Sequence, residues 1–139
     1  VRERVDTIAG ELGQKPPRLL GVTILTSMDQ DGMSQVGLSG APDNSVVNLA
    51  RLAVEAGLDG VVTSPLELGL LHQEPLNHLL RITPGVRPRM TSQDDQSRTM
   101  TPAEALRAGA SYLVIGRPIT AHADPLEAAR KINGKLGLC

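Results

Sequence analysis

The chain has 139 residues, the length of one ordinary domain, and its 40% apolar and 21% charged residues are normal for a globular protein. A formal net charge of -1 gives no extended field of one sign, so we expect neither nucleic acid nor a membrane surface as a partner. No apolar run approaches the ~20 residues that span a bilayer. One cysteine and three histidines exclude an internal disulfide and a Cys/His zinc cluster.

The aromatic content is low, because Tyr112 is the one aromatic residue among Phe, Trp and Tyr. The core must therefore consist of Leu, Val, Ile and Ala, and no stacking platform is available for single-stranded nucleic acid. The chain begins at Val1, without an initiator Met or a signal-peptide pattern. We therefore expect it to be part of a longer protein.

The first half of the chain alternates between helical and strand patterns. Residues 1–12 carry apolar side chains at helical spacing, and Gly13 suits the end of that helix. Residues 19–25 form an apolar run typical of a strand covered on both faces. A polar stretch follows, then a predicted helix over residues 45–56 and a predicted strand over residues 59–63.

Three later helices begin with one shared pattern, in which a capping residue is followed by Pro, any residue and Glu. Such a residue accepts a backbone N–H, Pro suits the first helical position, and Glu reaches back to the cap. The pattern occurs at Ser64-Pro65-Leu66-Glu67, Thr101-Pro102-Ala103-Glu104 and Asp124-Pro125-Leu126-Glu127. Strands are predicted between these helices, over residues 79–83 and 112–115.

Four successive strand–helix units predict the α/β class, with a parallel sheet and right-handed crossovers. Four units do not close a barrel, so one sheet face and two strand edges would remain uncovered. The alternatives are a small open sheet and the C-terminal half of a (β/α)8 TIM barrel. Because the chain starts within a helix, we favour the half-barrel, as a single partial domain over residues 1–139.

Two loops at predicted strand ends carry the residues best suited to an anion. The first runs from Thr83-Pro84-Gly85-Val86-Arg87-Pro88 to Asp94-Asp95-Gln96, and the second is Val114-Ile115-Gly116-Arg117-Pro118-Ile119-Thr120. Glycine lets the backbone approach a ligand, and arginine presents a planar fork of donors to phosphate. Loops at the last strands of a barrel commonly build a phosphate site. The alternatives are a solvated loop and a turn glycine followed by a surface arginine.

These residues resemble orotidine 5'-phosphate decarboxylase, over essentially the whole chain and in the same order. The segments that carry the resemblance are Val22-Thr23-Ile24-Leu25-Thr26-Ser27-Met28, Gly57-Leu58-Asp59-Gly60-Val61-Val62, Thr83-Pro84-Gly85-Val86-Arg87-Pro88, Asp95-Gln96 and Val114-Ile115-Gly116-Arg117-Pro118-Ile119-Thr120. The chain is similar to the C-terminal portion of the bacterial enzyme, from the helix before the fifth barrel strand onward.

The resemblance implies specific roles for five residues. Thr26 would lie against the pyrimidine, while Arg87, Gln96, Gly116 and Arg117 would bind the substrate around its 5'-phosphate. In the family, carbon dioxide is removed from orotidine 5'-phosphate to give uridine 5'-phosphate without metal or organic cofactor. The implied setting is pyrimidine nucleotide synthesis in the cytoplasm, by a homodimer of complete chains.

One part of the family pattern has no counterpart in this sequence. The Asp-x-Lys-x-x-Asp segment, whose lysine protonates the reacting carbon, does not occur, and Lys15, Lys131 and Lys135 lie outside the predicted strand ends. We therefore assign no catalytic residue and expect this chain alone to be inactive. A non-catalytic phosphate-binding half-barrel, which assembles with itself or a partner, is the alternative. Another phosphate-binding barrel, such as a sugar-phosphate epimerase, is disfavoured by the Leu-Thr-Ser and Asp-Gln segments.

Overall fold

The fold was taken from a computed structural model of the chain. The structure describes residues 1–24, 28, 30–38, 40–73, 75–76, 78–88 and 100–137. In chain order its elements are α1 (Arg2–Glu11), β1 (Leu20–Val22), α2 (Gln30–Gln35), α3 (Pro42–Glu55), β2 (Gly60–Val62), the 3-10 turn η1 (Pro65–Glu67), α4 (Leu68–Gln73), β3 (Leu80–Thr83), α5 (Pro102–Arg107), β4 (Tyr112–Leu113), α6 (Arg117–Thr120) and α7 (Pro125–Lys135).

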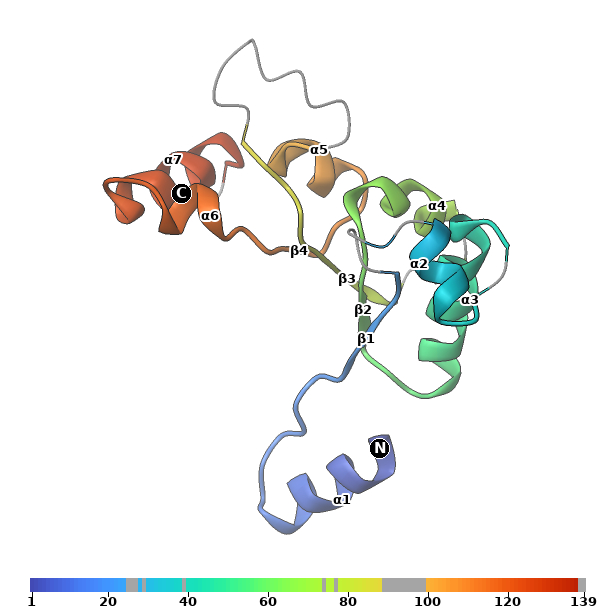
Figure 1. The fold of residues 1–139 in the computed structure, drawn as a ribbon. Helices are drawn as coiled ribbons and strands as arrows, with labels where there is room; N and C mark the ends of the chain where they lie inside the picture. The colour runs from blue at the N-terminus through green and yellow to red at the C-terminus, as the bar shows by residue number, and fades with distance from the viewer. Residues whose placement is uncertain are drawn as a thin grey trace.

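The four strands form one parallel sheet in the order β1-β2-β3-β4 (Figure 1). Their register aligns Val22 with Val62, Ile82 and Tyr112. Sequential neighbours in a parallel sheet require a crossover through each intervening helix. The predicted alternation of four strands with helices is therefore confirmed.

Helices cover one face of the sheet and leave the other face uncovered. On the covered face, Val61 of β2 packs with Val46 and Ala50 of α3 and with Leu71 of α4 in the main core cluster. On the opposite face the side chains are large, apolar and 42–56% exposed: Leu20, Val22, Tyr112 and Val114. The uncovered face predicted for four units is thus present. Residues 19–25 were predicted to be covered on both faces, and this is wrong for β1 within the described residues, because no helix or strand there packs over its second face.

Threonines form a polar row where the first three strands end. Thr23, Thr63 and Thr83 follow or end neighbouring strands in matching register, and all three are buried. The Thr23 hydroxyl donates to the Val62 carbonyl at 3.0 Å, and the Thr63 hydroxyl donates to Glu67 Oε2 at 2.8 Å. The Thr83 hydroxyl has no partner in the described part of the chain.

All three predicted helix starts are confirmed. Ser64 and Thr101 each form a complete capping box with the glutamate three residues later, and Asp124 accepts the backbone N–H of Glu127. Reciprocal capping satisfies N–H groups that otherwise lack a partner at a helix start. The local pattern was sufficient because every interacting group lies within four residues.

Other boundaries differ from the predictions. Helix α3 begins at Pro42 rather than at residue 45, and α2 lies in a stretch predicted to be merely polar. Met33 of α2 is fully buried against the core. One buried side chain in a six-residue helix leaves no periodic signal, so tertiary packing decides this element.

The N-terminal helix is joined to the sheet by charged contacts. Arg2 of α1 donates to Asp59 Oδ2 at 2.7 Å, and the same carboxylate oxygen accepts the Leu19 N–H at 2.7 Å. The hydrogen bond from Leu19, followed by the charge of Arg2, lowers the pKa of Asp59. Helix α1 therefore lies beyond the N-terminal ends of the strands, away from the predicted phosphate loops (Figure 1).

Candidate functional site

The two predicted phosphate loops leave neighbouring strands at the same edge of the sheet. Strands β3 and β4 pair in parallel, and the Val114 N–H donates to the Thr83 carbonyl at 2.9 Å. The chain then turns into residues 84–88 on one side and 114–117 on the other. Because carboxyl ends of parallel strands meet at one edge, ligands of open α/β sheets bind there. The loops that carry Arg87 and Arg117 are therefore adjacent, as predicted.

Gly116 and Arg117 present unoccupied donors. Both residues are exposed, and within the described residues neither their backbone N–H groups nor the Arg117 guanidinium makes a hydrogen bond. The Gly116 carbonyl accepts the Ile119 N–H at 2.8 Å, which fixes the turn. A Cβ on Gly116 would meet no atom within 4 Å. The segment thus combines charge, N–H donors and open space, which together suit a phosphate oxygen.

Arg87 is held from both sides of its loop. Its backbone N–H donates to the Met100 carbonyl at 3.0 Å, which joins the two ends of the 88–99 segment. The preceding residue, Val86, is 3% exposed and packs in a cluster with Leu68 of α4 and Ala105 of α5. Gly85 adopts a φ of 78°, a region that favours glycine. These contacts fix the backbone while the Arg87 side chain remains exposed.

A half-buried carboxylate, that of Glu67, lies next to this edge of the sheet. Glu67 Oε2 accepts the Thr63 hydroxyl at 2.8 Å and the Ser64 N–H at 3.0 Å. Burial raises the pKa of Glu67, and the two hydrogen bonds oppose that rise. Glu67 directly precedes Leu68, so the capping box also sets the helix against which Val86 packs. Glu67 thus connects the end of β2 to the start of the helix whose Leu68 packs with Val86.

The predicted site residues divide into two groups. Arg87, Gly116 and Arg117 lie on the two adjacent loops, whereas Thr26 and Gln96 lie outside the described residues. Among the residues that the structure describes, no group of three His, Cys, Asp or Glu side chains could hold a metal ion. No helix in the described ranges is long and apolar enough to cross a membrane.

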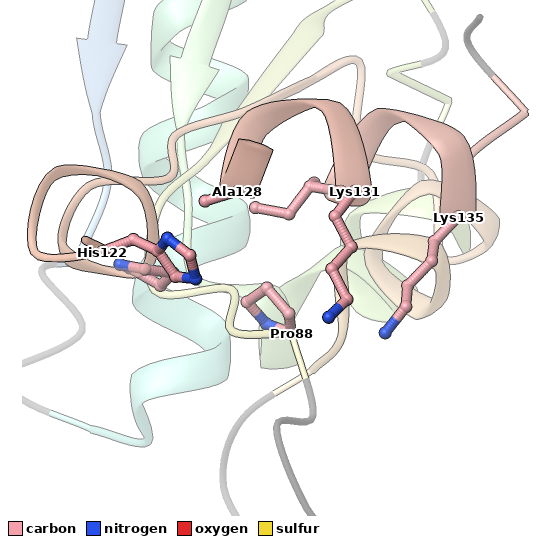
Figure 2. A pocket seen from close by; sticks show the side chains of 7 residues that line it. Pro88, His122, Ala128, Lys131 and Lys135 are labelled. Atoms are coloured by element: carbon pink, nitrogen blue, oxygen red, sulfur yellow. The ribbon is translucent and has the colours of Figure 1, made fainter. Parts of the chain in front are cut away.

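A cavity of about 100 Å³ lies beside the two loops and was not predicted (Figure 2). Pro88 and Pro118, which follow Arg87 and Arg117 directly, line it together with residues of α7 and His122. His122 is half-buried, and its Nδ1 lies 3.0 Å from the Asp124 nitrogen. The one signal of this cavity along the chain is the proline that follows each arginine.

Comparison with known proteins agrees with this geometry. The family model described as orotidine 5'-phosphate decarboxylase / HUMPS family matches residues 4–132. The chain belongs to this family.

Relatives in the orotidine 5'-phosphate decarboxylase / HUMPS family show how much of the family fold this chain contains. The chain is 52% identical, over 86% of its length, to orotidine 5'-phosphate decarboxylase of Nitrosococcus oceani, of which it covers 52%. The enzyme of that name from Vibrio campbellii is 46% identical, and the match covers 96% of this chain and 59% of that protein. The crystal structure of the Lactobacillus acidophilus enzyme superposes with a TM-score of 0.75 at 36% identity, over 89% of this chain and 51% of that one. The chain thus spans about half the length of the relatives it matches, and its fold corresponds to one half of the family barrel.

Proposed function

We propose that the chain provides the phosphate- and pyrimidine-binding part of an orotidine 5'-phosphate decarboxylase, within a single partial domain. The observation that supports this most is the adjacency of the Arg87 and Gly116-Arg117 loops, in a chain 52% identical to a protein of that name. The reaction proposed for the complete protein releases carbon dioxide from the pyrimidine ring and leaves uridine 5'-phosphate.

The residues of this chain would act by binding and orientation. The Gly116 and Arg117 N–H groups and the two guanidinium groups would hold the 5'-phosphate at the edge of the sheet. Thr26 and Gln96 complete the proposed contacts, with the pyrimidine and near the phosphate. Binding energy from a remote phosphate accelerates the reaction only when it holds the reacting ring in the geometry of the transition state. Proton transfer to that ring would come from an Asp-x-Lys-x-x-Asp segment, which does not occur in this sequence.

Co-production with the other half of a relative tests the proposal. The partner is the N-terminal half of the Nitrosococcus oceani enzyme, which supplies the strands that this chain does not contain. We expect the assembled pair to decarboxylate orotidine 5'-phosphate and each half alone to be inactive. A pair that assembles and binds uridine 5'-phosphate without turnover would refute the decarboxylase assignment and support a non-catalytic phosphate-binding module.

Two further parts of the proposal rest on the family resemblance. They are a homodimer of the complete protein and a cytoplasmic location. Sedimentation of the assembled pair at several concentrations tests the first part: a mass of two complete barrels is expected, and a mass of one barrel would contradict it.

A further inference from the structure

The cavity beside the phosphate loops has a cationic wall on α7. Ala128 and Ile132 form its buried apolar floor, and Lys131 and Lys135 extend along its side toward Pro88 (Figure 2). Pro88 and Pro118 each follow one of the two site arginines in the chain. The two lysines therefore line the same cavity as the prolines that follow the site arginines, next to the two phosphate loops.

Local electrostatics does not explain this placement. Lys131 and Lys135 are one helical turn apart, where like charges destabilise a helix. Glu127 occupies the favourable position one turn before Lys131, yet no ion pair joins them, and within the described part of the chain neither lysine pairs with any carboxylate. The helix C-terminus favours a cation at Lys135 in the last turn. It does not account for Lys131, which turns toward Pro88 instead of Glu127.

The charge of this region also differs from that of the whole chain. Residues 116–137 contain four cationic side chains and two carboxylates, whereas the chain carries a net charge of -1. One of these carboxylates, Asp124, is engaged at the start of α7 by the Glu127 N–H. Lys131 and Lys135 line the cavity beside the loops, and among the described residues neither Asp124 nor Glu127 does.

We propose that Lys131 and Lys135 attract the dianionic phosphate of the nucleotide and accelerate its association with the Arg87 and Arg117 loops. This inference rests on the proposed function. Charges near a site raise the association rate without contacting the bound ligand, and salt screens the effect within a Debye length of about 8 Å at physiological ionic strength. The lysines are steering residues, so the dissociation rate should not depend on them.

The test compares rate constants for the assembled pair with the Nitrosococcus half. The double variant Lys131→Gln with Lys135→Gln removes both charges, and Arg130→Gln is the matched control, because Arg130 is an exposed cation on the same helix that does not line the cavity. Phosphorus NMR line shapes of uridine 5'-phosphate give both rate constants. We expect about a fivefold slower association for the double variant at low ionic strength, reduced to below about twofold near 0.15 M salt.

The outcomes distinguish failure of the steering role from failure of the phosphate site. Lys131→Arg with Lys135→Arg should restore the association rate, which separates loss of charge from damage to the helix. A double Gln variant that behaves like Arg130→Gln overturns the steering role, and so does a change confined to the dissociation rate. If the unmodified pair binds uridine 5'-phosphate no more tightly than uridine, the proposed phosphate site itself is wrong, and steering with it.

Discussion

Replacing Arg117 with alanine tests the phosphate site most directly. The side chain is exposed and makes no hydrogen bond within the described residues, so its removal should change the free energy of unfolding by less than about 0.5 kcal/mol. If the guanidinium donates to a phosphate, each lost charge-assisted hydrogen bond weakens binding by about 1.5–3 kcal/mol. That corresponds to a loss of roughly tenfold to 150-fold in affinity.

Calorimetric titration of the assembled pair with uridine 5'-phosphate and with uridine measures this loss. We expect Arg117→Ala to lower the affinity for uridine 5'-phosphate and to leave the affinity for uridine unchanged. The value of kcat/KM for orotidine 5'-phosphate should fall at least about tenfold. Arg117→Lys keeps the charge without the planar fork, so its affinity for uridine 5'-phosphate should lie between those of the unmodified pair and Arg117→Ala. Arg107→Ala is the control, because this arginine is also exposed and lies in the last turn of α5. Equal affinity of Arg117→Ala and Arg107→Ala for the nucleotide would remove Arg117 from the site.

Three further predictions concern single positions. Gly116→Ala should leave the melting temperature nearly unchanged, since the new Cβ meets no protein atom within 4 Å. The same change should lower the affinity for uridine 5'-phosphate measured by titration. An unchanged affinity would mean that no ligand approaches Gly116. Gly60→Ala should lower the free energy of unfolding in urea by about 2 kcal/mol or more, because the new Cβ would lie 2.6 Å from the Leu80 carbonyl oxygen; a neutral change would contradict the strand register. Asp59 has a lowered pKa when folded, so its contribution should be present above pH ~4 and be lost as the pH falls through its folded value. The stability advantage over Asp59→Asn should therefore disappear in acid, and a constant difference down to pH 2 would exclude the Leu19 contact as its cause.

The sequence by itself determined the alternation of the four strands with helices and the three helix caps. Each cap is a local event, in which Ser64, Thr101 or Asp124 meets a group within four residues, so spacing along the chain is enough to predict it. The apolar runs at the strands carry comparable information, because burial between layers requires them whatever the exact register. The family resemblance of Arg87, Gly116 and Arg117 likewise depends on the order of residues alone.

Tertiary structure alone decided which groups lie together across the chain. Pairing of β3 with β4 brings the Arg87 and Arg117 loops to one edge, and no local spacing encodes a contact between residues 30 positions apart. Tertiary packing likewise decides the burial of Met33 and the position of Lys131 beside the cavity that Pro88 lines. Such contacts depend on how whole helices pack, and packing is set by the summed shape of many side chains. For that reason the phosphate residues were predictable one at a time, while the cationic wall beside them was not.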